Sequence, residues 1–426
     1  MISPRDRSRR FAALVSAMVL LVRCSTAPVA IQSPLVTVVP TGTAAPLGTA
    51  GPTTTPTATP TATQAHTAEG WTSAPSQAAI SGAQFQDVVW TGQRFVAAGI
   101  GLTGGGVFVS SADGQRWLSV PSGGTSGYPR RVAAGASGVV AVGTIDDRPA
   151  SWISPDGRRW TYRVAVFPTA LKGDDEVGVT DVVATTRGWL AVGRDDPICD
   201  VACGRNPLRA LAWTSSDAET WTRVPAQASL SKAAINAVAA FDGGFVAVGE
   251  AAGHAAFWTS ADGLTWTRVP DDPIFGRPPG ATADSTVSAV GVAAAGGTIV
   301  AVGVASGATS AGAPIVEAWR STDGRTWTRA TVNNAEEGQV FAVAATAGRF
   351  LATGPSGDTS CLGGIWSSTD GATWACAATD AAFAGFGPYA AAGSPALEVA
   401  VGLTDVGWDP NGPLGLPGAI WWRPIP

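Results

Sequence analysis

The stretch Ser260-Ala261-Asp262-Gly263-Leu264-Thr265-Trp266 decides the fold, because close copies of it occur at five other places in the chain. Five of the six copies read Ser-x-Asp-Gly-x-x-Trp, and the sixth has Ala218 in the glycine position. The Ser hydroxyl and the Asp carboxylate can bond to the backbone and Gly supplies positive φ, so each copy predicts a hairpin turn. The repeated aspartates are Asp113, Asp156, Asp217, Asp262, Asp323 and Asp370. Their spacing is typical of one four-stranded propeller blade per repeat.

A second repeated feature counts the blades independently of the turns. Each repeat contains a short apolar strand that ends in glycine, such as Phe245-Val246-Ala247-Val248-Gly249. Strands of this kind end at Gly99, Gly143, Gly193, Gly249, Gly303, Gly354 and Gly402. Their unbroken apolar character is expected of strands that are covered on both faces by neighbouring blades. The chain therefore shows seven strands of this kind but only six turns.

The mismatch predicts how the ring closes. The last repeat ends at Ala419-Ile420-Trp421-Trp422, which matches the third-strand segment Gly364-Ile365-Trp366-Ser367. The segment Gly70-Trp71-Thr72-Ser73-Ala74-Pro75 matches the fourth-strand segment at residues 265–270. We therefore expect an all-β, seven-bladed β-propeller in which the N-terminal strand completes the last blade, which removes an open sheet edge.

Residues 1–24 have the layout of a secretory signal peptide, with basic residues followed by an apolar run from Phe11 to Val22. The segment Leu21-Val22-Arg23-Cys24 resembles a bacterial lipobox, in which Cys24 would be lipidated, but Arg23 stands where a small residue is usual. Simple secretion is the alternative. Residues 25–68 are rich in Thr, Pro and Ala and predict a disordered linker, so the propeller domain would span residues 69–426 at the cell surface or outside the cell.

Composition excludes some functions. A net charge of -5 gives no basic stripe for a nucleic acid. Apart from Cys24, the cysteines are Cys199, Cys203, Cys361 and Cys376, and an even number in an oxidising compartment favours disulfides. The simplest pairings join 199 to 203 and 361 to 376, within single repeats. A metal site at Cys199 and Cys203 is a weaker alternative, because no histidine is near.

The six turns resemble the Asp-box, or bacterial neuraminidase repeat, usually written Ser-x-Asp-x-Gly-x-x-Trp, although here the motif is one residue shorter. The resemblance covers every blade except the seventh and implies a sialidase-like propeller. It does not imply catalysis, because in these families the turn lies at the perimeter. The catalytic set that sialidases need is not recognisable: the first blade reads Phe85-Gln86-Asp87-Val88-Val89-Trp90 instead of Arg-Ile-Pro, and among the tyrosines only Tyr389 could face the channel.

A ligand face is expected on the side opposite the turns, where the long loops lie. These loops carry acidic residues, and the candidate ligand-binding residues are Asp146, Asp147, Asp174, Asp175, Glu176, Asp195, Asp196, Asp271, Asp272 and Tyr389. Paired carboxylates could serve a glycosidase, and calcium favours the same oxygens. Solvated surface charge is the simpler reading, so we expect no cofactor and no catalytic residue.

Two hypotheses follow. The first is a monomeric, non-catalytic binding module for a glycan, a peptide or an envelope partner, with membrane contact only through a lipid anchor. The second is a glycoside hydrolase of the sialidase-like or xyloglucanase-like kind. A pair of carboxylates close to Tyr389 and two or more arginines would favour the enzyme, whereas a channel lined by Ala and Val would favour the binding module.

Overall fold

The computed structural model describes residues 70–75, 77–102, 104–122, 127–146, 148–164, 166–168, 176–196, 209–309, 312–356, 361, 363–377, 383, 386–404 and 418–425. By contacts the chain divides into two units, residues 1–65 and residues 66–426. All described residues belong to the second unit.

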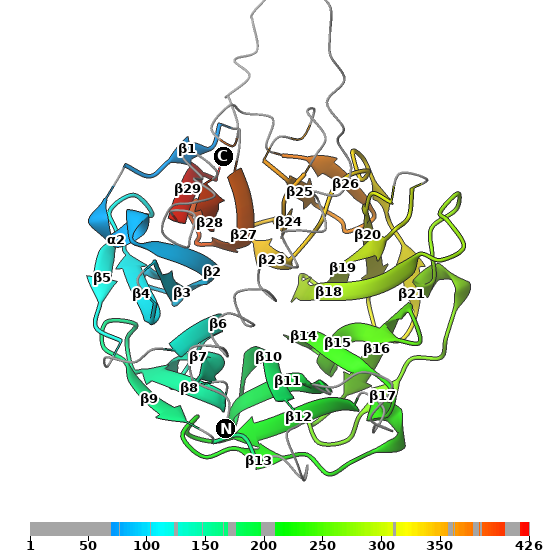
Figure 1. Ribbon diagram of the computed structural model, residues 1–426, viewed down its shortest axis with the longest axis horizontal. Helices are drawn as coiled ribbons and strands as arrows, with labels where there is room; N and C mark the ends of the chain where they lie inside the picture. Colours follow the sequence, from blue (N-terminus) through cyan, green and yellow to red (C-terminus); the bar gives the residue numbers. More distant parts are fainter. Residues whose placement is uncertain are drawn as a thin grey trace, which may run out of the picture. The chain divides into compact units, whose positions relative to one another are not determined.

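Seven sheets form this unit, and each sheet is a blade (Figure 1). Blade 1 contains β2 (Ala83–Trp90), β3 (Phe95–Gly101), β4 (Gly106–Ser111) and β5 (Leu118–Val120). Blade 2 contains β6 (Gly127–Gly135), β7 (Gly138–Ile145), β8 (Arg148–Ser154) and β9 (Thr161–Val164). Blade 3 contains β10 (Glu176–Thr185), β11 (Gly188–Asp196), β12 (Arg209–Ser215) and β13 (Thr222–Arg223). Blade 4 contains β14 (Ala234–Phe241), β15 (Gly244–Ala251), β16 (His254–Ser260) and β17 (Thr267–Arg268).

The remaining blades follow in chain order. Blade 5 contains β18 (Thr286–Ala295), β19 (Thr298–Ser306), β20 (Ile315–Ser321) and β21 (Trp327–Arg329). Blade 6 contains β23 (Ala342–Thr346), β24 (Arg349–Thr353), β25 (Ile365–Ser368), β26 (Thr373–Cys376) and β22 (Thr331–Val332). Blade 7 contains β27 (Phe386–Gly393), β28 (Leu397–Thr404), β29 (Gly418–Pro424) and β1 (Thr72–Ser73). The first strand of each blade faces the middle of the ring and is its inner strand (Figure 1).

The N-terminal strand closes the ring. β1 pairs antiparallel with β29, with Thr72 opposite Trp422 and Ser73 opposite Trp421. The predicted seven-bladed fold and its closure by the segment after Trp71 are therefore confirmed. One detail of the prediction was wrong: blade 6 has five strands, because Thr331 and Val332 leave blade 5 and pair parallel with Thr373 and Trp374.

Among the described residues, three short helices lie between blades. α2 (Ala78–Ser81) follows β1, η2 (Ala228–Leu230) lies between blades 3 and 4, and η3 (Pro273–Phe275) lies between blades 4 and 5. Each helix buries one apolar side chain, which is Ile80, Leu230 or Phe275. Within the described ranges, no helix has the length and apolar character needed to cross a membrane.

In all six Ser-Asp turns the Asp Oδ1 accepts the backbone N–H two residues further on, and further bonds recur in most of them. In blade 4, the backbone N–H groups of Leu264 and Thr265 donate to Oδ1 of Asp262 at 2.8 and 2.9 Å. The N–H of Gly263 donates to Ser260 Oγ at 2.9 Å, and Trp266 Nε1 donates to the Gly263 carbonyl at 3.1 Å. The backbone bonds from Thr265 and Leu264 lower the pKa of Asp262, so its carboxylate is firmly ionised.

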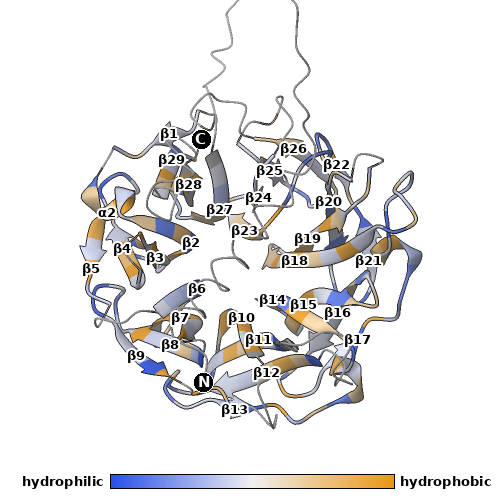
Figure 2. Ribbon diagram, in the orientation of Figure 1, coloured by the Kyte–Doolittle hydropathy of each residue, from blue (hydrophilic) through white to orange (hydrophobic). Residues whose placement is uncertain are grey.

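Tryptophans on the third strands form hydrogen bonds with the connections between blades. Trp258 Nε1 donates to the Ser229 carbonyl at 2.7 Å, and Trp319 Nε1 donates to the Ile274 carbonyl at 2.8 Å, each acceptor lying in the connection that enters the tryptophan's own blade. Both indole rings are fully buried. Figure 2 shows apolar residues concentrated on the strands, where neighbouring blades pack face to face.

A buried ionic cluster reinforces the closed seam in blade 7. Glu398 is fully buried and accepts bonds from Arg423 Nε at 2.6 Å, Arg349 Nε at 2.9 Å and Thr346 Oγ1 at 2.6 Å. The guanidinium of Arg423 lies 4.5 Å from the centre of the Trp71 ring. The cluster thus joins blade 6, two strands of blade 7 and the start of the closing strand.

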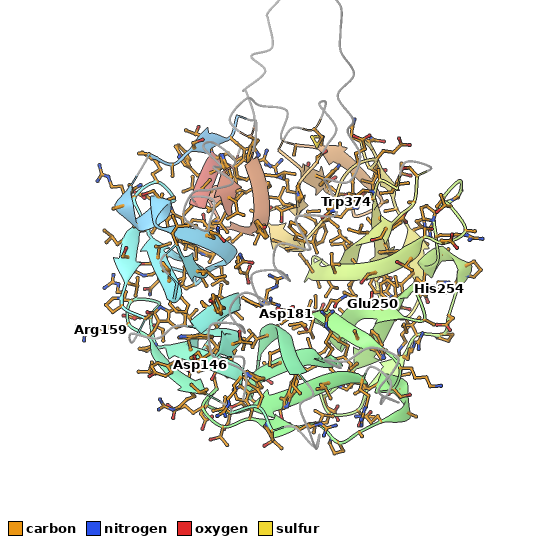
Figure 3. The ribbon with its side chains drawn as sticks, viewed as in Figure 1. Asp146, Arg159, Asp181, Glu250, His254 and Trp374 are labelled. Atoms are coloured by element: carbon orange, nitrogen blue, oxygen red, sulfur yellow. A yellow bond between two sulfur atoms is a disulfide. The ribbon has the colours of Figure 1, made fainter. Side chains whose placement is uncertain are left out.

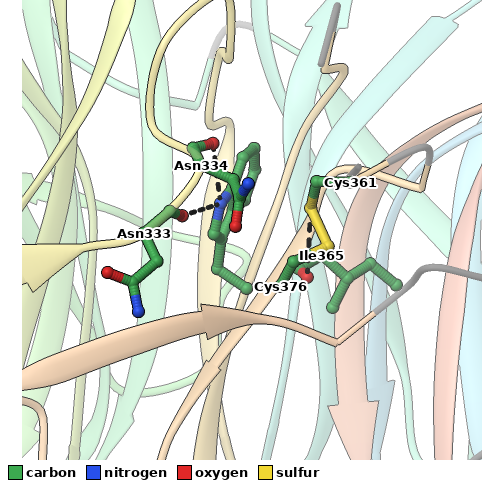
Figure 4. Close-up of a disulfide and its surroundings, with 6 residues drawn as sticks. Asn333, Asn334, Cys361, Ile365 and Cys376 are labelled. Carbon is green, nitrogen blue, oxygen red and sulfur yellow. Dashed lines mark hydrogen bonds between the residues drawn. A yellow bond between two sulfur atoms is a disulfide. The ribbon is translucent and has the colours of Figure 1, made fainter. Parts of the chain in front are cut away.

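A disulfide joins Cys361 to Cys376 in blade 6 (Figure 4). Beside it, Trp366 Nε1 donates to the carbonyls of Asn333 and Asn334 at 3.2 and 3.3 Å. Cys24, Cys199 and Cys203 lie outside the described residues.

Candidate functional site at the propeller axis

The inner strands share one irregularity that decides which side chains surround the axis. In six of the seven blades the inner strand carries one residue more than its partner strand at the same level, a β-bulge that turns the following side chain. In blade 6, Phe341 stands at the equivalent position, and its N–H donates to the Thr353 carbonyl at 2.8 Å. The residues directly after this position are Asp87, Arg131, Asp181, Ala237, Gly291, Ala342 and Ala390.

These seven positions divide the axis into two halves. Blades 1 to 3 contribute the charged side chains Asp87, Arg131 and Asp181, whereas blades 4 to 7 contribute only alanine or glycine. Figure 3 shows Asp181 at the inner side of the ring. We name Asp87, Arg131 and Asp181 the axial cluster.

Both axial carboxylates join neighbouring blades. Asp87 Oδ1 accepts from its neighbour Val88 N at 2.9 Å, and Oδ2 accepts from Val132 N in blade 2 at 2.8 Å. Asp181 repeats the arrangement, with Oδ1 accepting from Val182 N at 2.8 Å and Oδ2 from Val238 N in blade 4 at 2.9 Å. All four carboxylate oxygens therefore receive a backbone hydrogen bond.

Burial nevertheless disfavours the ionised form of both groups. Loss of solvation raises the pKa of Asp181 to about 7, against the lowering effects of Arg131 and of the Val238 N–H. The pKa of Asp87 is also raised by burial, with Arg131 opposing the shift. The charge of Asp87 raises the pKa of Asp181 further, so the two carboxylates and Arg131 form one coupled group.

Two aromatic rings lie at the inner strands of blades 6 and 7. Tyr389 is the bulged residue of blade 7, Phe341 stands at the equivalent position of blade 6, and their rings stack with centres 4.9 Å apart. Burial raises the pKa of the Tyr389 hydroxyl. Arg131 reaches across from blade 2, and its Nη2 donates to the Phe341 carbonyl at 3.4 Å. The axial cluster and the aromatic pair are thus linked through one arginine.

The candidate acidic residues whose side chains are described, Asp146, Asp271 and Asp272, do not form one site. Asp146 is exposed in the turn between β7 and β8 of blade 2. Asp271 and Asp272 follow the outermost strand of blade 4, where Asp271 pairs with Arg268 at 2.8 Å and Asp272 Oδ1 accepts from Ile274 N at 3.0 Å to cap η3.

The other candidates are only partly described. Asp147, Asp174 and Asp175 lie outside the described residues. Glu176, Asp195 and Asp196 are described in their backbone alone, at the paired ends of β10 and β11. Among the candidates whose side chains are described, Tyr389 alone lies on an inner strand, beside the axis. Among the described residues there is no group of three or more His, Cys, Asp or Glu side chains arranged to hold a metal ion.

The axial cluster was missed, although the sequence contains a signal for it. Asp87, Arg131 and Asp181 stand at one fixed offset before a strand-ending glycine, which is Gly99, Gly143 or Gly193. The same offset leads to the small residues of the other four blades. Aligning the repeats on these glycines would therefore have separated three charged positions from four small ones.

A family model described as "DUF6242 beta propeller domain" matches residues 47–294, more than half of the 426-residue chain. No curated protein matches the sequence. Solved structures similar to this chain include an alpha-L-arabinanase of Penicillium chrysogenum complexed with arabinobiose, with 9% identity, a TM-score of 0.44 and coverage of 83% of this chain and 96% of that chain.

Two further similar structures are a sialidase and a lectin. Trypanosoma rangeli sialidase has 12% identity, a TM-score of 0.40 and coverage of 69% of this chain and 54% of that chain. The SapL1 lectin in complex with alpha methyl fucoside has 12% identity, a TM-score of 0.40 and coverage of 70% of this chain and 95% of that chain. The neighbours thus include glycoside hydrolases, a sialidase and a lectin, and likeness of this degree carries no argument about what this chain does.

Proposed function

This chain belongs to the family of the DUF6242 beta propeller domain, and we propose that it is an exported, surface-tethered binding module that recognises a glycan, a peptide or an envelope partner without catalysing its turnover. The observation that carries the proposal is that both axial carboxylates accept backbone hydrogen bonds that join adjacent blades. A catalytic pair in a glycosidase must present its oxygens to the scissile bond and to a proton.

Asp87 and Asp181 instead connect the inner strands of adjacent blades. Each accepts one backbone N–H from its own strand and one from the next blade, at 2.8 to 2.9 Å. Removing either carboxylate would leave two buried N–H groups without this hydrogen-bond acceptor, which would lower the free energy of unfolding. Their positions are therefore explained by the assembly of the ring.

The export part of the proposal is supported by the sequence and by one bond. The signal-like segment at residues 1–24, the lipobox-like segment ending at Cys24 and the Thr/Pro/Ala-rich linker at residues 25–68 belong to an exported, tethered protein. The disulfide between Cys361 and Cys376 agrees with an oxidising compartment. The hydrogen bonds of the six Ser-Asp turns support their identification as Asp-box turns.

A glycoside hydrolase is the second candidate, and one observation favours it. A general acid needs a pKa near the working pH, and burial raises the pKa of Asp181 to about 7 beside Asp87 and Arg131. In that reading Asp181 donates the proton to the leaving group and Asp87 is the second carboxylate.

The experiment that separates the two candidates combines a glycan array with a panel of fluorogenic glycosides. We expect binding without release of the fluorophore. Release that Asp181→Asn abolishes, and that the exposed control Asp146→Asn leaves unchanged, would establish the hydrolase and refute the binding module.

A further inference from the structure

A groove of about 910 Å³ lies between blades 4 and 5, on the side of the molecule that carries the Ser-Asp turns. Its walls are the turns after the first and third strands of both blades. We name it the blade 4–5 groove, and its principal lining residues are Phe241, Asp242, Asp262, Thr298, Asp323 and Arg325. It lies away from the axial cluster, which belongs to the inner strands of blades 1 to 3.

The groove exists because small residues occupy the turns that border it. The first turn of blade 5 contains Gly296 and Gly297, and an added Cβ would meet nothing within 4 Å at either position. In blade 4, Gly244 stands at the position that is arginine in blades 1 and 6, where Arg94 and Arg349 reach toward the following blade. Blade 4 therefore has no long side chain reaching toward blade 5 at this position.

An aromatic side chain lies at the base of the groove. Phe241 is half-buried and packs against the apolar cluster that contains Ile299. A Cβ built on Gly324, in the facing turn, would lie 3.5 Å from Phe241 Cζ and 3.7 Å from Ile299 Cδ1. The equivalent positions of blades 1, 2, 3, 5 and 6 hold Thr91, Gly135, Thr185, Ala295 and Thr346, so the aromatic ring is particular to this groove.

The rim combines ionised acceptors with one strong donor. Backbone bonds lower the pKa of Asp262, and they lower that of Asp323 to about 2, so both are charged at neutral pH. Oδ1 of each carboxylate serves its own turn, as in the bonds from Thr265 N at 2.9 Å and from Thr326 N at 2.7 Å. Asp242 and Arg325 are exposed on the same rim, which therefore carries three carboxylates and one guanidinium.

We propose that the blade 4–5 groove binds a non-acidic glycan, one whose sugars are neutral or carry an amino group. The apolar face of a sugar ring packs on Phe241, and its hydroxyl groups donate to Asp242 and Asp262 and accept from Arg325. The excess of carboxylates repels sugars that carry a carboxylate of their own. This inference rests on the proposed binding function, whose ligand it narrows to a glycan, and it locates the site away from the axis.

The test uses the full chain on a glycan array, followed by calorimetric titration with the best non-acidic oligosaccharide. Thr267→Arg places a long side chain in the groove, because Thr267 lines it and is exposed on the outer strand of blade 4, and the substitution is expected to weaken binding at least tenfold. The matched control is Thr220→Arg, the same substitution at an exposed position of the blade 3 turn, and it should change affinity less than twofold. Thermal unfolding verifies that each variant is folded.

A second variant keeps the proposal testable if Thr267→Arg fails to fold. Asp242→Asn removes one charged acceptor from the exposed rim and should weaken binding by about tenfold, as expected for a hydrogen bond to a charged group. Preferential binding of acidic glycans or of basic peptides would overturn the inference, and so would full affinity in both groove variants. If Asp181→Asn abolishes glycan binding while Thr267→Arg does not, the groove is excluded and the binding function at the axis stands.

Discussion

Replacing Glu398 by glutamine should destabilise the propeller more than any change of one surface charge. Glu398 occupies a strand position that is apolar in the other blades, where Phe95, Phe245 and Phe350 stand. Arg423 stands where the other blades have the serine of their turn. The two charges occur together in the one blade that receives its outer strand from the other end of the chain.

The size of the effect follows from burial. The side chains of Glu398 and Arg423 are 0% and 1% exposed, and that of Arg349 is 13% exposed. Glutamine keeps the shape of Glu398 but leaves two cations near one neutral group. Removing one partner of a buried ion pair costs about 3–5 kcal/mol, because the other charge remains buried without compensation.

The assay is equilibrium denaturation in urea, compared with Glu219→Gln. Glu219 pairs with Arg163 at 2.9 Å with both side chains more than 40% exposed, so its loss should cost at most about 1 kcal/mol. The idea that the buried cluster stabilises the seam would be refuted if both substitutions lowered the unfolding free energy by the same small amount. The slope of the unfolding free energy against urea concentration must be unchanged in that comparison.

Three further predictions concern other parts of the ring. Burial raises the pKa of Glu317 to about 7 from 4.5, so the folded chain holds this proton more tightly than the unfolded chain. The unfolding free energy should therefore fall by up to about 3 kcal/mol as pH rises through that interval, and Glu317→Gln should flatten this part of the stability profile. Gly157→Ala should cost about 2–4 kcal/mol in a denaturant titration, because φ is +73° and the new Cβ would lie 2.5 Å from Val96 Cγ2. Gly92→Ala, at φ +88° with nothing within 4 Å, should cost only about 1 kcal/mol, and equal costs would exclude packing between blades as the cause. Reduction of the disulfide between Cys361 and Cys376, which closes a loop of 15 residues, should lower the unfolding free energy by about 3 kcal/mol. An unchanged denaturation midpoint in reducing buffer would contradict that expectation.

The fold could be predicted because its determinants are local and repeated. The Ser-Asp turns and the glycine-ended strands specify each hairpin within a short stretch of chain, and the surplus strand predicts closure by the segment after Trp71. β22 could not be predicted in this way, because Thr331 and Val332 pair with the outer strand of the next blade and carry no repeat signature.

The candidate site was harder to predict because its residues lie within the repeated inner strands and not in the loops. Asp87 and Asp181 lie in apolar strands, and only the bulges turn their side chains toward the next blade. Acidic loop residues such as Asp271 and Asp272 were more visible, yet they make local contacts at the outer edge of blade 4. Charge in a loop is a weak sign of function, whereas charge at a normally apolar repeat position is a stronger one.

The central claim is that the axial carboxylates hold blades together in a protein that binds without turnover. Its most direct test measures fluorogenic glycoside hydrolysis and glycan binding side by side for the wild type and for Asp181→Asn. The account predicts no hydrolysis by either protein and a lower unfolding midpoint for the variant. Hydrolysis by the wild type that is lost in a variant of unchanged stability would contradict it.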